Sequence, residues 1–385
     1  MTILYWIFFI LSIFGILSMT LALLSLTSHF SKKKKMQANT EALSLIVPIK
    51  GADENTQQNL TALVNSDIGT AVEYLFAMES EDDPAFDVCS RVKDSFANRD
   101  IRIIITGESK ELMGKQHNIH AAIKEASYDI IGSMDADVRV TPTALRTGLE
   151  SLQQSETGIV YFLPYYEGSG TLGGGLLNTY INNFYNLIFS YLHFFAKAPT
   201  VIGALWMMPK ELFVKCSADG RFANTVSDDR ELGFATAELG YKNYFIPQTV
   251  MMPHEKLSFK EGIKHLGKWF GMIRAEGIFV YIIFALLWNP LLTALLSLSL
   301  ALFGGADIVY ASLLTVSVVV LRIFGVILLN KSIYNLPLTS NLGMTLIYDI
   351  FIFPLLVFIN LFRTSIEWKG KVYRLGKHGR IVLNV

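Results

Sequence analysis

Cysteine is scarce in this sequence, since 385 residues include only Cys89 and Cys216. Two thiols cannot build a disulfide framework, and no histidine or cysteine lies around them at zinc-ligand spacing. A surplus of one charge is also lacking, because 33 basic residues balance 33 acidic residues. A general nucleic-acid binder is therefore not indicated. No Gly-Lys-Ser/Thr follows the glycine-rich stretch 168–175, which excludes a P-loop.

Apolar residues are abundant: they make up 51% of the chain and gather at its two ends. Residues 3–29 carry no charge and are long enough to span a bilayer. Four lysines, 32–35, follow this run, whereas a secretory signal has a shorter apolar region with its charge in front. We therefore expect an uncleaved anchor. The positive-inside rule predicts that the N-terminus faces out and that the central stretch lies in the cytosol.

Three further apolar segments, 278–303, 308–329 and 343–362, are candidate membrane spans near the other end. Four spans in total would place the C-terminus outside, yet the tail from Trp368 to Arg380 is strongly basic, which favours the inside. One apolar segment is then re-entrant or interfacial, and the break at Asn289-Pro290 makes the first of the three the candidate. The sequence leaves the side of the tail open.

The stretch between the apolar ends alternates short apolar runs with segments of helical periodicity. This alternation predicts an α/β fold with a mostly parallel sheet covered on both faces. In such sheets ligands bind beyond the carboxyl ends of the strands. Strands are predicted at 42–48, 72–78, 101–105 and 128–134, with helices at 55–64, 87–96 and 115–125.

Acidic residues follow two of these strands and open a later helix. The second strand ends in 79–83, the fourth ends in Asp135 and Asp137, and Asp228-Asp229 begins an apparent helix. In an extended segment residues i and i+2 point to the same side, so both carboxylates of an Asp-x-Asp pair can face one ligand. Carboxylate oxygens suit Mg²⁺ or Mn²⁺, which would bridge to a diphosphate. Taken singly, each group also fits a solvated turn, so the interpretation depends on their joint order.

That order resembles the inverting, family 2-type glycosyltransferases of the GT-A nucleotide-sugar-binding fold. The resemblance extends over the whole chain and is greatest to the ceramide glucosyltransferases and the hopanoid-glycosylating enzymes. It is carried by Val47-Pro-Ile-Lys-Gly51, Asp82-Asp-Pro-Ala-Phe-Asp-Val-Cys89, Asp135-Ala-Asp-Val-Arg-Val140, Ser227-Asp-Asp-Arg-Glu231 and Glu367-Trp-Lys-Gly-Lys-Val-Tyr373.

The resemblance implies a role for each matching acid. Asp83 would contact the uracil or ribose end of a UDP-sugar, and Asp135 would support the ribose or the diphosphate. Asp137 would bind Mg²⁺ or Mn²⁺. Asp229 would be the general base that removes the proton of the acceptor hydroxyl, with Asp228 as the second candidate for that role.

Other residues match the family pattern with a departure. Where relatives have Gln/Arg-x-x-Arg-Trp on an interfacial helix, this chain has His265, Lys268 and Trp269. Lysine does not replace a two-pronged arginine, which argues against a processive polysaccharide synthase. Arg274 follows on the same helix and is a further candidate for contact with phosphate. A membrane-surface helix with lysines facing headgroups is the alternative. His254 is a candidate metal ligand or a structural histidine.

These observations predict a lipid glycosyltransferase in the membrane. The predicted segments are an N-terminal anchor at 1–30, a cytosolic GT-A domain at 41–258, an interfacial amphipathic helix at 259–277, membrane helices at 278–363 and a basic tail at 364–385. The expected reaction is metal-dependent transfer of one hexose, glucose by expectation, from a UDP-sugar to a membrane lipid hydroxyl, as in sphingolipid or glycolipid synthesis. A bacterial inner membrane is favoured over the ER or Golgi. The alternatives are a polyprenyl-phosphate sugar transferase, a polysaccharide synthase, or a catalytically dead membrane scaffold.

Overall fold

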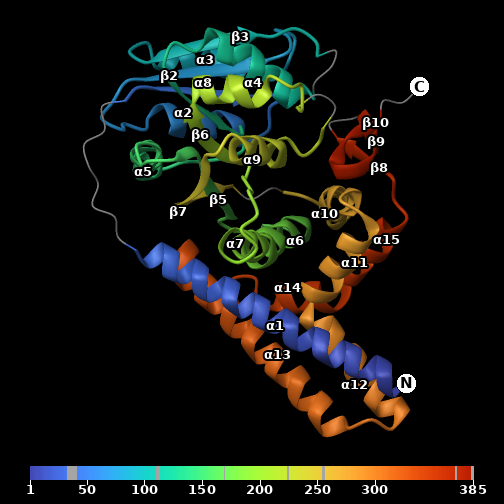
Figure 1. The fold of residues 1–385 in the computed structure, drawn as a ribbon. Helices are drawn as coiled ribbons and strands as arrows, with labels where there is room; N and C mark the ends of the chain where they lie inside the picture. Colours follow the sequence, from blue (N-terminus) through green and yellow to red (C-terminus); the bar gives the residue numbers. More distant parts are fainter. Residues whose placement is uncertain are drawn as a thin grey trace. The chain divides into compact units, whose positions relative to one another are not determined.

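The computed structural model describes residues 1–32, 41–109, 113–168, 170–222, 225–253, 256–368 and 371–382. The chain divides into two compact units. Unit 1 comprises Met1–Lys32, Tyr166–Lys197 and His254–Val385, and unit 2 comprises Lys33–Tyr165 and Ala198–Pro253. Figure 1 traces both by sequence colour.

Unit 2 is built around a seven-stranded sheet of order β3-β2-β1-β4-β6-β5-β7. The strands are β1 (Leu43–Pro48), β2 (Val72–Met78), β3 (Asp100–Ile105), β4 (Ile130–Met134), β5 (Thr157–Tyr166), β6 (Leu205–Pro209) and β7 (Lys242–Met252). β1 pairs in parallel with β2 and β4, and β2 pairs in parallel with β3. β6 is antiparallel to both β4 and β5. The predicted α/β fold with a mostly parallel sheet is confirmed.

The first four strands lie where the sequence predicts them because their apolar runs are continuous. β1, β2 and β4 are buried along almost their whole length, as expected for strands covered on both faces. The helices of this unit connect the strands: α2 (Thr56–Val64), α3 (Ala85–Ser95), α4 (Gly114–Glu125), α5 (Pro142–Leu152), α8 (Lys210–Ser217) and α9 (Asp228–Glu238). α5 begins with a typical cap, since Thr141 Oγ1 accepts from the Ala144 amide at 3.2 Å and Pro142 takes the first helical position.

Unit 1 is mainly helical. Its elements are α1 (Thr2–Ser31), α6 (Leu172–Tyr180), η1 (Ile181–Tyr185), α7 (Asn186–Phe194), α10 (Phe259–Ala275), α11 (Ile278–Leu287), α12 (Pro290–Gly304), α13 (Ile308–Leu329), η2 (Asn330–Tyr334), α14 (Leu342–Ile347), η3 (Tyr348–Ile352) and α15 (Phe353–Leu361). η1, η2 and η3 are π-helical turns. A small antiparallel sheet follows α15 and consists of β8 (Ser365–Trp368), β9 (Lys371–Leu375) and β10 (Ile381–Val382). The order of its strands is β10-β9-β8.

Among the residues that the structure describes, three helical stretches of unit 1 are long and apolar enough to cross a membrane: Thr2–Ser31, Ile308–Tyr334 and Leu342–Leu361. α11 and α12 qualify together as a fourth, but they meet at an angle of 78°. The bend lies at the predicted Asn289-Pro290 break. There the Asn289 side chain caps α12 by accepting from the Leu292 amide at 2.9 Å, and Pro290 begins the new helix. Figure 1 shows α1, α12 and α13 side by side.

Candidate active site

A lysine at the start of α4 lies among acidic residues at the carboxyl ends of the strands in unit 2. Lys115 Nζ lies 2.6 Å from Asp135 Oδ1, just past β4, and donates to the Gly203 carbonyl oxygen at 3.4 Å. The next residue, Gln116, donates from Nε2 to Asp228 Oδ2 at 2.5 Å. The start of α4 therefore binds both the acid after β4 and an acid that opens α9.

Asp229 belongs to the same cluster. A Cβ placed on Gly203 would lie 3.4 Å from Asp229 Oδ2 and 3.4 Å from Lys115 Nζ, so the carboxylate and the ammonium group both border this glycine. The Arg230 amide donates to Asp229 Oδ1 at 2.8 Å. The structure thus brings together three of the predicted acids, Asp135, Asp228 and Asp229, around one lysine.

The charges in this cluster alter its protonation. Burial and the neighbouring Asp228 raise the pKa of Asp229 to about 7, although Lys115 and the amides of Arg230 and Gly203 act in the opposite direction. Burial lowers the pKa of Lys115, but the negative charges of the three aspartates outweigh it and raise that pKa above its usual range. The lysine is thus protonated at neutral pH. A carboxyl group with a pKa near the working pH is well suited to act as a general base.

Asp83 lies in the loop after β2 and binds backbone amides. Its Oδ1 and Oδ2 accept from the Gly51 amide at 2.9 and 3.1 Å, and Oδ1 also accepts from the Ala85 amide at 2.9 Å. Gly51 has a φ of +73°, a conformation that glycine adopts without strain. Asp83 therefore joins the loops that follow β1 and β2. Its contact with a nucleotide stays a prediction.

Asp137 lies two residues beyond Asp135, in a loop whose backbone is fixed on two sides. The Asp135 amide donates to the Ala204 carbonyl at 3.0 Å, and Asn59 Nδ2 donates to the Ala136 carbonyl at 3.2 Å. Asn59 is itself held by Arg139, whose Nε donates to Asn59 Oδ1 at 2.7 Å. Asp137 is partly exposed at this strand end.

These residues fit a divalent cation only if the cation is shared with a substrate. In the described part of the chain, no three acidic, histidine or cysteine side chains gather closely enough to hold a metal. His254, the other predicted ligand, lies outside the described residues. Mg²⁺ is often held by one or two carboxylates together with substrate phosphates. Asp137 with a diphosphate matches that donor set.

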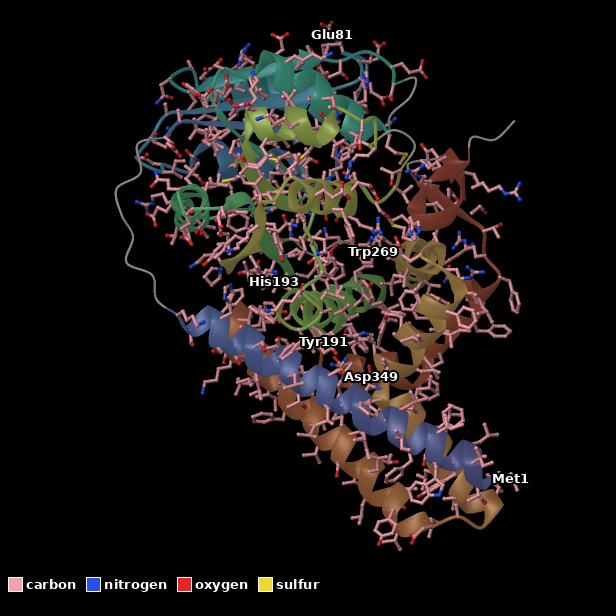
Figure 2. The ribbon with its side chains drawn as sticks, viewed as in Figure 1. Met1, Glu81, Tyr191, His193, Trp269 and Asp349 are labelled. Carbon is pink, nitrogen blue, oxygen red and sulfur yellow. The ribbon has the colours of Figure 1, made fainter. Side chains whose placement is uncertain are left out.

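The predicted residues of the interfacial helix lie on α10, in unit 1. The His265 and Trp269 rings are 4.6 Å apart, and Lys268 Nζ lies 3.4 Å from His265 Nε2. Tyr180 of α6 stacks on Trp269 with 5.2 Å between ring centroids. Arg274 instead donates from Nε to the Leu361 carbonyl at 3.0 Å, which gives it a structural contact. His265, Lys268 and Trp269 thus form one group, which Figure 2 marks by Trp269.

The sequence reasoning missed Lys115 and Gln116. A signal was available, because Gly114-Lys115 opens the helix that follows β3, and helices of this kind begin at the same sheet edge as the acidic loops. Lysines on helices usually face solvent, so the pattern alone did not single this one out.

Comparison with solved structures identifies the fold. A mannosyltransferase from Pyrobaculum calidifontis, solved in complex with GDP-Man and Mn²⁺, superposes with a TM-score of 0.51 over 91% of this chain and 99% of the other, at 15% identity. The fold is therefore that of the GT-A glycosyltransferases.

The family follows from the sequence comparison. The model of glycosyl transferase family 21 matches residues 7–381, and the chain belongs to this family. It is 21% identical over 241 residues to ceramide glucosyltransferase 3 of Caenorhabditis elegans, covering 62% of this chain and 51% of the relative. It is 28% identical over 133 residues to the ceramide glucosyltransferase of Komagataella phaffii, covering 33% of this chain and 26% of that relative. The matches thus cover about half of the first relative and about a quarter of the second, and the resemblance to ceramide glucosyltransferases is confirmed at low identity.

Proposed function

We propose that the chain transfers a single hexose, glucose in the first instance, from a UDP-sugar to a hydroxyl group of a membrane lipid. The observation that carries the proposal is the Asp229 carboxyl group, which has a pKa of about 7 and borders Lys115 and Gly203 at the carboxyl edge of the sheet. Membership of a glycosyltransferase family and similarity to ceramide glucosyltransferases support the reaction class.

In the proposed step, Asp229 removes the proton of the acceptor hydroxyl. The acceptor oxygen then forms its bond to the anomeric carbon as the bond from that carbon to the diphosphate oxygen breaks, and the nucleoside diphosphate leaves. One displacement of this kind inverts the anomeric centre. Asp228 keeps Asp229 basic through its negative charge, and Lys115 limits that effect.

The donor would lie along the loops after β1, β2 and β4. Asp83 would hold the nucleoside end, Asp135 the ribose or diphosphate, and Asp137 a Mg²⁺ or Mn²⁺ ion shared with the phosphates. When bound, the cation stabilises the charge on the leaving diphosphate. The Mn²⁺ and GDP-Man in the similar mannosyltransferase support a metal-dependent donor site of this kind.

The acceptor is proposed to stay in the bilayer. Helices long and apolar enough to cross a membrane make up much of unit 1, so a lipid substrate need not leave the membrane. His265, Lys268 and Trp269 on α10 are proposed to contact the acceptor or phosphate. The basic residues near the membrane segments support a cytosolic location for unit 2.

Transfer of radiolabel from UDP-glucose into organic-extractable lipid tests the proposal. Membranes carrying wild type, Asp229→Asn or Glu238→Gln are compared, since Glu238 is an exposed acid at the other end of α9. Removal of the base should lower the rate by about 10²- to 10⁴-fold. Label in wild type and Glu238→Gln alone supports the proposal. Undiminished label in Asp229→Asn refutes the base, and no label from any UDP-sugar with folded wild type refutes the function.

A further inference from the structure

Residues 342–361, which contain α14, η3 and α15, are apolar and long enough to cross a bilayer. The residue before this segment and the first turn of the segment are bound to α6 and η1 of unit 1. Asn341 Nδ2 donates to Asn178 Oδ1 at 2.5 Å, and Asn183 Nδ2 donates to Thr345 Oγ1 at 2.8 Å. The entry of the segment is therefore fixed beside α6.

The last residues of the segment are bound to α10. Arg274 Nε donates to the Leu361 carbonyl at 3.0 Å. Just beyond the segment in sequence, Glu367 of β8 is also bound to α10, with its Oε1 2.8 Å from Lys264 Nζ. The exit of the segment, and the sheet that follows it, are therefore fixed beside α10.

α6 and α10 pack directly against each other, so the entry and the exit lie in one layer. A Cβ on Gly262 of α10 would lie 2.7 Å from Gly173 Cα of α6, which means that only glycine permits so close an approach. Seven residues further along each helix, Tyr180 stacks on Trp269. The two helices therefore run side by side over their shared length. Because one end of 342–361 is bound to α6 and the other end to α10, these ends are too close together to lie on opposite sides of a bilayer.

The long helix α1 gives a scale for depth. Near its start, Tyr5 Oη donates to the Asp307 carbonyl at 3.2 Å, which places the turn between α12 and α13 at that end. Farther along, Ser190 Oγ of α7 donates to the Ala22 carbonyl at 3.1 Å. With a rise of about 1.5 Å per residue these two levels are about 25 Å apart, which is close to the hydrocarbon thickness of about 30 Å.

The middle of the segment reaches only part of this depth. Asn289 Nδ2, at the bend between α11 and α12, donates to the Asp349 carbonyl at 2.7 Å. At the same bend, Ser12 Oγ donates to the Pro290 carbonyl at 2.9 Å. By the helical rise Ser12 is still about 10 Å short of the level of Tyr5. Figure 2 labels Asp349 well away from Met1, which lies at the far end of α1.

We infer that residues 342–361 do not cross the membrane but enter and leave it on the side of α10, with their outward face against the acyl chains of that leaflet. α1, the bent pair α11–α12 and α13 are then the three crossings. The segment that does not cross is thus 342–361, and not 278–303, which the sequence made the candidate. Because unit 2 is joined in sequence to the end of α1 and the start of α10, the basic tail lies on the same side as unit 2. The inference does not depend on the proposed function.

The surface of the segment agrees with this placement. Phe351 and Phe358 are 65% and 68% exposed, so the outward face presents large apolar side chains to lipid. On the inward face, the buried Asp349 is paired with Arg322 of α13, at 2.9 Å from Nε to Oδ2. Charged groups at membrane depth are expected to face the protein and to be paired in this way. A tail on the side of unit 2 also removes the conflict between its basic residues and four crossings.

Cysteine labelling tests the placement with little background. The two native thiols, Cys89 and Cys216, are both buried. Single cysteines are introduced at Asp94 in α3 to mark the side of unit 2, at Ala306 in the turn between α12 and α13 to mark the far side, and at Arg374 in β9 to report the tail. A membrane-impermeant maleimide is applied to intact cells and to inverted vesicles. Only cysteines that react fully after solubilisation are compared.

The expected result is that Arg374→Cys and Asp94→Cys are labelled in the same one of the two preparations, intact cells or inverted vesicles, and are not labelled in the other. Ala306→Cys should show the opposite pattern. Labelling of Arg374→Cys together with Ala306→Cys would mean that 342–361 crosses the membrane and would overturn the inference. Labelling of Ala306→Cys together with Asp94→Cys would also overturn it, because the α12–α13 turn would then not mark a far side.

Discussion

The proposed base predicts a specific dependence of the transfer rate on pH. Asp229 acts only when its carboxyl group is ionised, and its pKa is raised to about 7 by burial and by Asp228. The value of kcat/KM, which reports the pKa of the free enzyme, should therefore fall as the pH falls through 7. An aspartate of ordinary pKa, about 3.9, would stay ionised throughout the neutral range and give a flat profile.

The size of the effect follows from the pKa. At pH 6 about one tenth of Asp229 would be ionised, and at pH 8 about nine tenths, for a pKa of about 7. The initial rate of sugar transfer to lipid should thus rise about tenfold between these values, with half of the plateau reached near pH 7.

Two variants separate this reasoning from a general effect of pH. Lys115→Met removes the positive charge that lowers the pKa of Asp229, so the profile should move toward higher pH. Asp228→Asn removes the negative charge that raises it, and the profile should move toward lower pH. Lys115→Arg keeps the charge and serves as the control.

The assay measures kcat/KM for label transfer between pH 5.5 and 8.5 in detergent-solubilised enzyme, with donor and acceptor held well below saturation. A profile that is flat between pH 6 and 8 would refute the assignment of the base. Equal profiles for Lys115→Met and Lys115→Arg would refute the electrostatic role of the lysine, even if the wild-type profile has the predicted shape.

Three further predictions concern the metal and the packing of unit 1. EDTA should abolish transfer and added Mn²⁺ should restore it in wild type but not in Asp137→Asn; full activity after chelation would disprove the metal assignment. Gly173→Ala should lower the unfolding temperature, because its Cβ would meet backbone of the loop before α10 at 2.1 Å, whereas Gly168→Ala meets nothing within 4 Å and should not. Arg322→Met should destabilise the protein by about 3–5 kcal/mol, and a second change, Asp349→Leu, should restore most of that loss; thermal unfolding in detergent measures both, and equal loss in the double variant would contradict the pairing.

The first half of the sheet was predictable because its signal is local. β1 to β4 are short, nearly continuous apolar runs separated by helical periodicity, and each lies within two residues of its predicted limits. The sequence gives no comparable signal for the position of β6 in the sheet. Leu205–Pro209 lies between β4 and β5 and pairs antiparallel with both, although these strands are distant in sequence. Such pairing is decided by tertiary contacts, which a single sequence window does not contain.

The clustering of Asp135, Asp228 and Asp229 was predictable from the sequence, whereas the position of Lys115 among them was not. Asp135 and the Asp228-Asp229 pair stand next to recognisable element ends, and parallel topology brings such ends to one edge. Lys115 becomes a site residue only through its 2.6 Å contact with Asp135 and its closeness to Asp229 across Gly203. The shift in the pKa of Asp229 likewise results from burial and neighbours, so the identity of the residue alone does not predict it.

The membrane segments show why length and hydropathy are insufficient for topology. A re-entrant segment can have the same length and the same mean hydropathy as a helix that crosses the membrane. What distinguishes them here is where a few polar side chains bind: Asn341 beside α6, and Asp349 beside Arg322 and the bend at Asn289. Replacing a buried ion pair by apolar residues is often neutral for stability, so the pair is better explained by specificity. On this hypothesis, the polar residues of an apolar segment determine which neighbours it accepts, and through them how deeply it enters the membrane.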